Sequence, residues 1–173
     1  MLSVSAEGGW IAHAKVQVEL SPVLVDAVKR GVPLYFVSEV EVRKVRWWWF
    51  DKTIFSQSKT VRLSYHAVTQ QYRVAVGGLH QMSYERLEDA LSAAVGMRGW
   101  RVKDANEAIE DEGPGIDWAA SGVESRLRVR LDSAQLPKPL QVNALTNRDW
   151  NLSSGWITTK VALSLSNSEM PSR

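Results

Sequence analysis

The sequence contains no cysteine, so disulfide bonds, thiol nucleophiles and thiolate metal ligands are all excluded. Its histidines are His13, His66 and His80, and no two of them have the i, i+4 spacing that places two metal ligands on one helix face. A glycine-rich phosphate loop is also missing, because Gly77 and Gly78 stand alone after a strand pattern and indicate a turn. We therefore expect neither a metal nor a cofactor.

Long apolar runs are missing too. No run approaches the roughly 20 residues of a membrane-spanning helix, so we expect no membrane span. The first seven residues have neither the basic segment nor the apolar stretch of a signal peptide, so the protein is cytoplasmic or the sequence is that of a mature exported chain. The formal net charge of +2 gives no field that would attract a polyanion, and we expect no nucleic-acid partner.

Alternating apolar and polar side chains are frequent, and this pattern is typical of half-buried antiparallel strands. We expect strands at residues 15–20, 34–49, 60–66, 71–76, 124–132 and 156–165. The short connection at 67–70 predicts a β-hairpin. Strands with one polar face bury themselves best when two sheets pack face to face. The sequence therefore predicts a mainly β fold, an antiparallel β-sandwich of the immunoglobulin-like or C2-like kind, with two short α-helices.

Both helices are indicated by their ends. Ser21 supplies a capping hydroxyl, Pro22 suits the first helical position, and Gly31 follows two cationic residues, which predicts a helix over 22–30. The second helix is predicted to open at Ser83 and to end before Gly96.

Residues 103–120 interrupt the alternation with six carboxylates and a Gly-Pro-Gly sequence, which predicts a solvated surface loop. The carboxylates lack the alternate spacing of a calcium loop. Two or three strands after this loop could not bury a core of their own. We therefore predict a single domain over 1–165 and a frayed tail at 166–173.

Catalysis has no sequence support. Serine is plentiful, but no Gly-x-Ser-x-Gly elbow precedes a helix. His66 lies on the polar face of its strand, where a solvated or hydrogen-bonded histidine is the favoured interpretation and a binding residue is the alternative. We expect a protein that is not an enzyme and has no catalytic residues.

The run Arg46-Trp47-Trp48-Trp49-Phe50 is the strongest candidate for a binding surface. Neighbouring side chains of a strand point to opposite faces, so one aromatic pair can face the core while the other faces outward. An outward Trp pair beside Arg46 would suit a protein interface. The alternative, which we favour, is that both pairs are covered.

Arg126, Arg128 and Arg130 form a positive stripe on one strand face. They could contact phosphates, but ion pairs with the acidic loop or with Glu39 and Glu41 on another strand are favoured.

The stretch 143–156 follows a connection at 136–139 that we expect to be rigid and extended. Asn147, Asp149 and Asn151 have short side chains that hydrogen-bond nearby backbone, so the stretch is interpreted as an ordered loop anchored by Trp150. We favour a structural corner that closes one end of the core over a binding loop.

Five blocks of sequence together resemble one bacterial family, domain of unknown function 4390, over about residues 14–160. The blocks lie at residues 20–22, 31–37, 46–51, 62–74 and 136–152. The resemblance implies an exported protein whose signal peptide is not part of this sequence, in a family typically encoded beside a membrane sensor kinase of the nitrogen-regulation type. It implies no known activity and no catalytic residues. The acidic stretch at 104–120 is longer than the family pattern leads us to expect.

Two functions remain open from the sequence. The first is a periplasmic binding or interaction module with a protein partner in the cell envelope, which could modulate a membrane sensor kinase. The second is a carrier of a small apolar or amphipathic ligand between the sheets or under a helix, with Trp and Tyr lining the site.

Overall fold

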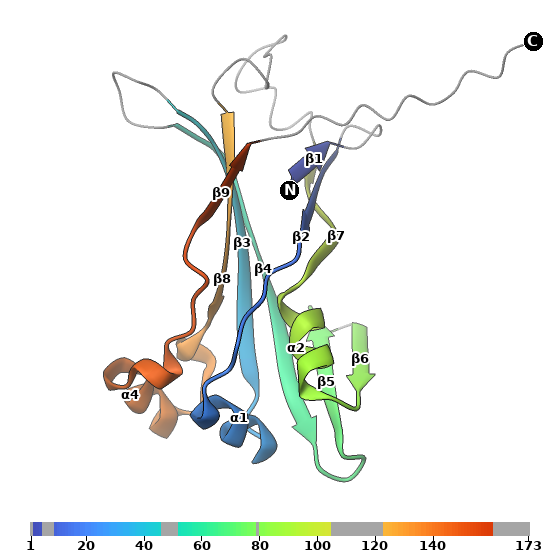
Figure 1. Ribbon diagram of the computed structural model, residues 1–173, viewed down its shortest axis with the longest axis vertical. Coiled ribbons are helices and arrows are strands. Elements are labelled where there is room, and N and C mark those ends of the chain that lie inside the picture. The colour runs from blue at the N-terminus through green and yellow to red at the C-terminus, as the bar shows by residue number, and fades with distance from the viewer. Residues whose placement is uncertain (1, 5–8, 46–51, 79, 105–122, 161–173) are drawn as a thin grey trace, which may run out of the picture.

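The computed structural model describes residues 2–4, 9–45, 52–78, 80–104 and 123–160, which form two antiparallel β-sheets (Figure 1). The larger sheet has the order β6-β5-β4-β3-β8-β9 and the smaller sheet the order β1-β2-β7. The strands of the larger sheet are β3 (Leu34–Lys44), β4 (Lys52–His66), β5 (Gln71–Val76), β6 (His80–Tyr84), β8 (Val123–Leu131) and β9 (Ile157–Lys160). Those of the smaller sheet are β1 (Leu2–Val4), β2 (Gly9–Ala14) and β7 (Met97–Asp104).

In the described part of the chain, three α-helices lie toward one end of the molecule (Figure 1). They are α1 (Pro22–Lys29), α2 (Leu87–Val95) and α4 (Lys138–Thr146), and two short 3₁₀ helices, η1 (Ser133–Gln135) and η2 (Arg148–Trp150), flank α4 in the chain.

The core joins the two sheets and two of the helices. Ala12 and Met97 come from the smaller sheet, Phe36 and Leu63 from the larger sheet, and Leu24 from α1, and all belong to one buried apolar cluster. Ala90, Leu91, Ala94 and Val95 add one face of α2 to this cluster. The prediction of a mainly β, antiparallel fold with its core between facing sheets is confirmed.

Several local predictions are also confirmed. The hairpin of β4 and β5 closes through residues 67–70, where Gln70 adopts a positive φ of 52°. The Ser21 hydroxyl accepts the Leu24 backbone N–H at 3.3 Å and caps α1. Gly31 follows this helix with a φ of 87°, a conformation that residues with a side chain rarely adopt.

The predicted strand at 15–20 is wrong. Val16 is buried and Lys15, Gln17 and Glu19 are exposed, as the alternation requires, but β2 ends at Ala14 and the next six residues pair with no strand in the described structure. An alternating pattern indicates that the side chains on one face of an extended chain are buried. It does not indicate whether the backbone is hydrogen-bonded to a neighbouring strand.

The helix predictions need two corrections. The second helix begins at Leu87, four residues after Ser83, because residues 80–84 pair with β5 as an edge strand. A third helix, α4, replaces the second half of the extended connection at 136–139 and the first part of the loop predicted at 143–156. Pro139 lies in its first turn, where the missing N–H of proline costs no hydrogen bond.

Candidate binding cleft

A half-open cleft of about 650 Å³, here called the main cleft, lies between residues 15–20 and α2. One wall is the whole 15–20 segment, and Val25 of α1 lies at its end. The opposite wall is formed by Leu87, Glu88, Leu91, Ser92 and Val95. Leu91 and Val95 are buried, while Glu88 and Ser92 are exposed at the opening. The main cleft therefore has an apolar floor and a polar rim.

The backbone of the 15–20 segment is the unusual feature of this site. None of its six residues forms a backbone hydrogen bond with the described part of the chain. Side-chain burial nevertheless alternates along it, since Val16 is buried and Val18 and Leu20 pack half-buried against the core. Backbone N–H and C=O groups in folded proteins are nearly always hydrogen-bonded, so these groups are open to water or to another molecule.

The segment and α2 run antiparallel along the main cleft. Ala14 pairs with Met97, so the end of α2 at Val95 lies beside Lys15, and the start of α2 lies beside the Leu20 end. Figure 1 shows the same arrangement, with the chain descending from β2 to α1 next to the ascending α2. Lys15 consequently lies at one end of the main cleft, and Glu19 and Glu88 lie at the other.

A second cleft, of about 350 Å³, lies along the same segment but is bounded by the region around η2. Gln17, Val18 and Glu19 line both clefts, and Arg148, Asp149 and Ser154 contribute to the second one. The 15–20 segment therefore has open space beside both of its edges.

The predicted corner residues surround η2. Asn147 caps η2 because its side-chain oxygen accepts the Asp149 backbone N–H at 2.9 Å. The Asp149 backbone carbonyl accepts the Ser21 hydroxyl at 2.7 Å, which links η2 to the start of α1. The Asn151 N–H donates to the Arg148 carbonyl, and Trp150 is only 5% exposed in the core cluster. Among the described residues, Asp149 makes its hydrogen bonds through its backbone and not through its carboxylate.

His66 lies at the end of β4, next to the hairpin turn. Its Nδ1 accepts the Thr69 N–H at 3.3 Å and lies 3.0 Å from the Thr69 hydroxyl. The ring thus participates in the turn of the hairpin, and it lines neither cleft. His13 accepts the Gly99 N–H at its Nδ1, 3.3 Å away.

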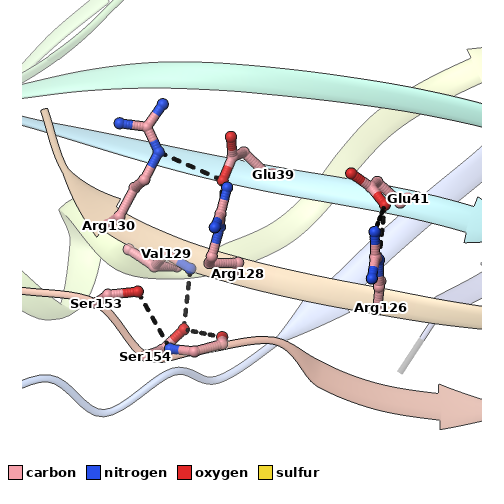
Figure 2. Close-up of polar contacts among 9 residues, drawn as sticks. Glu39, Glu41, Arg126, Arg128, Val129, Arg130, Ser153 and Ser154 are labelled. Carbon is pink, nitrogen blue, oxygen red and sulfur yellow. Dashed lines mark hydrogen bonds and ion pairs between the residues drawn. The ribbon is translucent and has the colours of Figure 1, made fainter.

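The arginine stripe pairs with the glutamates of β3 (Figure 2). Arg126 Nε lies 2.6 Å from Glu41, and Arg128 Nε lies 2.6 Å from Glu39. Arg130 approaches the same Glu39 carboxylate at 3.5 Å. The strand register places Glu41 opposite Arg126 and Glu39 opposite Arg128, so the pairs follow from strand pairing. The favoured sequence interpretation, ion pairing between strands, is confirmed for these residues.

Trp156 covers part of this stripe. The guanidinium carbons of Arg126 and Arg128 lie 4.3 and 4.4 Å from the Trp156 ring centroid. Cations over a Trp face are attracted by the ring quadrupole. The residues just before Trp156 also lie along β8, where the Ser154 hydroxyl accepts the Val129 N–H at 3.0 Å (Figure 2).

Two ionisable groups have shifted pKa values. Burial lowers the pKa of Lys59 below its usual value, and its ammonium lies 5.8 Å from the Trp100 ring centroid. Burial raises the pKa of Tyr72, and the neighbouring Tyr65 and Glu88 add to that increase.

Other predicted features lie elsewhere in the chain. The run Arg46-Trp47-Trp48-Trp49-Phe50, most of the acidic loop and the tail at 166–173 lie outside the described residues. Within the described ranges, no three His, Asp or Glu side chains are grouped closely enough to hold a metal ion. No helix in that part of the chain is long and apolar enough to cross a membrane.

The model of one protein family, described as domain of unknown function (DUF4390), matches residues 2–160. The chain belongs to this family. No match was found among curated proteins or among solved structures. The match extends over both walls of the main cleft and over the corner around η2.

The residues of the main cleft of this DUF4390 domain were not predicted from the sequence. Leu87, Leu91 and Val95 were recognised only as the apolar face of a helix, and residues 15–20 only as a strand. One signal was present in the sequence. A strand pattern at 15–20 that runs directly into a helix at Pro22 leaves no turn through which it could pair with its neighbour in the chain.

Proposed function

We propose that this domain is a non-enzymatic binding module of the cell envelope and that a protein partner binds in the main cleft. The observation that carries the proposal is the 15–20 segment, whose backbone has no hydrogen-bond partner in the described chain. A second molecule in the main cleft would meet these polar groups together with the apolar side chains of Leu87, Leu91 and Val95. Binding sites are usually concave and combine apolar surface with polar groups that set orientation, and the main cleft offers both kinds of group.

The envelope location draws on the family resemblance, which implies an exported protein. The same resemblance suggests the partner, because genes of the family typically lie beside a membrane sensor kinase. Modulation of that kinase is therefore part of the proposal, and it does not depend on the geometry of the main cleft.

Site-specific photo-crosslinking in cells of the native host tests the proposal. Gln17 and Ser92 are exposed residues on opposite walls of the main cleft, and a photoreactive amino acid at either position samples its occupant. Arg62, exposed on β4 and outside both clefts, is the matched control. We expect the same envelope protein to be captured from Gln17 and Ser92 and not from Arg62. The same products from all three positions, or none from the two in the main cleft, would contradict the proposal.

A carrier of a small apolar or amphipathic ligand is the second candidate. The aliphatic side chains of the main cleft favour it, and the volume lies within the range of about 300–1,000 Å³ found for ligand sites. Trp and Tyr, which we expected to line such a site, do not line this one. Native mass spectrometry of protein purified from its own host separates the candidates, because a carrier retains extra mass and a bare chain mass argues against one.

A further inference from the structure

We propose that the partner enters the main cleft as an extended peptide segment and pairs with residues 15–20 as an added β-strand. This inference rests on the proposed function and specifies the kind of ligand. The bound segment has apolar side chains at alternate positions, a basic residue at the end of the cleft near Glu19 and Glu88, and an acidic residue near Lys15.

The backbone of the 15–20 segment is the first support. A β-strand needs a neighbour that presents unpaired N–H and C=O groups, and this segment presents them over six consecutive residues in the described structure. Six extended residues span about 20 Å, which is enough for a short added strand. Because side-chain burial already alternates along the segment, it can accept a strand without changing which of its faces is covered.

The surroundings of the segment are the second support. Strand addition requires open space along one edge, and the main cleft provides it between the segment and α2. An added strand would lie about 4.8 Å from the segment, with the apolar face of α2 on its far side. Side chains that point inward from such a strand would contact Leu87, Leu91 and Val95.

The charges at the two ends of the main cleft specify where the charged residues of the bound segment lie, and we assign the segment an antiparallel direction. An antiparallel partner begins opposite Glu19 and ends opposite Lys15, so a basic residue at its start and an acidic residue at its end form favourable cross-strand pairs. A peptide with the sequence Lys-Val-Thr-Val-Glu meets this pattern, since its two valines then lie opposite Val18 and Val16.

Nuclear magnetic resonance titration of the full, isotope-labelled chain with acetylated and amidated Lys-Val-Thr-Val-Glu tests the inference. We expect saturable shifts confined to residues 15–20 and 87–95, with cross-strand contacts between peptide and segment α-protons. Two N-methylated versions provide the decisive comparison, one methylated at the first, third and fifth residues and one at the second and fourth. Alternate N–H groups of a strand point to opposite edges. One version should therefore bind about tenfold more weakly, while the other binds as the parent does.

A charge reversal tests the direction of the added strand. Glu19 is exposed and forms no ion pair with the described residues, so Glu19→Lys leaves the fold intact. The variant should bind Lys-Val-Thr-Val-Glu about two- to fivefold more weakly and the reversed peptide Glu-Val-Thr-Val-Lys correspondingly more tightly. Tighter binding of Lys-Val-Thr-Val-Glu to the variant than to the wild type, or weaker binding of the reversed peptide, would overturn the antiparallel assignment.

Three outcomes would overturn strand addition itself. They are equal loss of affinity in both N-methylated versions, no saturable shift at millimolar peptide, and concentration-dependent shifts of residues 15–20 without peptide, which would identify a second copy of the chain as the occupant. Crosslinking from Gln17 and Ser92 reports separately on the proposed function. If crosslinks to an envelope protein persist while the peptide results fail, the main cleft binds its partner in another way. If both fail, the proposed function fails too.

Discussion

Replacement of Trp150 by alanine tests whether the region around η2 is a structural corner. Trp150 is 5% exposed and belongs to the core cluster, and the hydrogen bond from the Ser21 hydroxyl to the neighbouring Asp149 carbonyl joins η2 to the start of α1. A Trp side chain buries about 150–250 Å², which at about 25 cal/mol per Å² corresponds to an upper limit of about 4–6 kcal/mol. Trp→Ala replacements in cores cost about 3–5 kcal/mol. We therefore expect Trp150→Ala to lower the free energy of unfolding by about 3–5 kcal/mol.

Urea unfolding followed by far-ultraviolet circular dichroism measures this change without relying on tryptophan fluorescence. Trp156→Ala is the matched control, because Trp156 is half-buried and covers Arg126 and Arg128 on an outer sheet face. Its loss removes two cation–π contacts worth about 0.5–1 kcal/mol each at exposed sites. We expect the control to be clearly less destabilised than Trp150→Ala.

The reasoning would be refuted if Trp150→Ala unfolded within about 1 kcal/mol of the wild type. That result would mean that the corner is not part of the cooperative core, and the second cleft beside η2 would then become the stronger candidate for a binding site. A variant too unstable to purify would be replaced by Trp150→Phe, for which a smaller loss is expected because most of the apolar ring volume is kept.

Three further measurements follow from contacts at other positions. Ser21→Ala should lower the free energy of unfolding by about 1–2 kcal/mol, because the variant loses the α1 cap and the hydrogen bond to the Asp149 carbonyl. Asp149→Ala should stay within about 0.5 kcal/mol of the wild type, because that hydrogen bond uses the backbone of Asp149. Equal thermal melts for the two variants would contradict this pair of expectations. Glu39→Gln should lower stability by about 1 kcal/mol in low salt and by less in high salt, and a loss that does not depend on salt would argue against the ion pairs. The lowered pKa of Lys59 means that the unfolded chain keeps this proton to higher pH than the folded chain does, so wild-type stability rises with pH between the folded-state pKa and 10.5. In urea titrations, the free energy of unfolding of Lys59→Met should lack this part of the increase with pH. Identical pH profiles for the variant and the wild type would argue against a lowered pKa of Lys59.

Most strands of the larger sheet could be predicted because each carries its own evidence, whereas β6 and the three strands of the smaller sheet lie outside every predicted strand. Alternation along 34–44, 60–66, 71–76 and 124–131 requires one covered and one polar face, and the structure covers the apolar face of each. The pairing of Arg126 and Arg128 with glutamates could be anticipated for a similar reason, because opposite charges on polar strand faces stabilise neighbouring strands.

The third helix could not be predicted from its pattern. None of the residues of α4 is buried, and Val142 and Leu145 are exposed, so the helix has no apolar stripe that the sequence could reveal. Its two prolines favour an extended chain as much as a helical start, since proline suits both a polyproline segment and the first turn of a helix. A helix without a buried face therefore cannot be recognised from the periodicity of its apolar residues.

The 15–20 segment shows why the candidate site was harder to predict than the fold. Its alternation reports burial correctly, and burial is a property of side chains, whereas the feature that makes it a candidate site is a property of its backbone. Every residue carries the same N–H and C=O groups regardless of its side chain, proline excepted, so no residue type at these positions could reveal that the groups lack a partner. Only the three-dimensional arrangement shows that β7 lies beside β2 as far as Ala14 and that α2 lies beside the 15–20 segment that follows. A strand pattern whose partner in the fold is a helix is therefore the observation that leads from this sequence to a binding site.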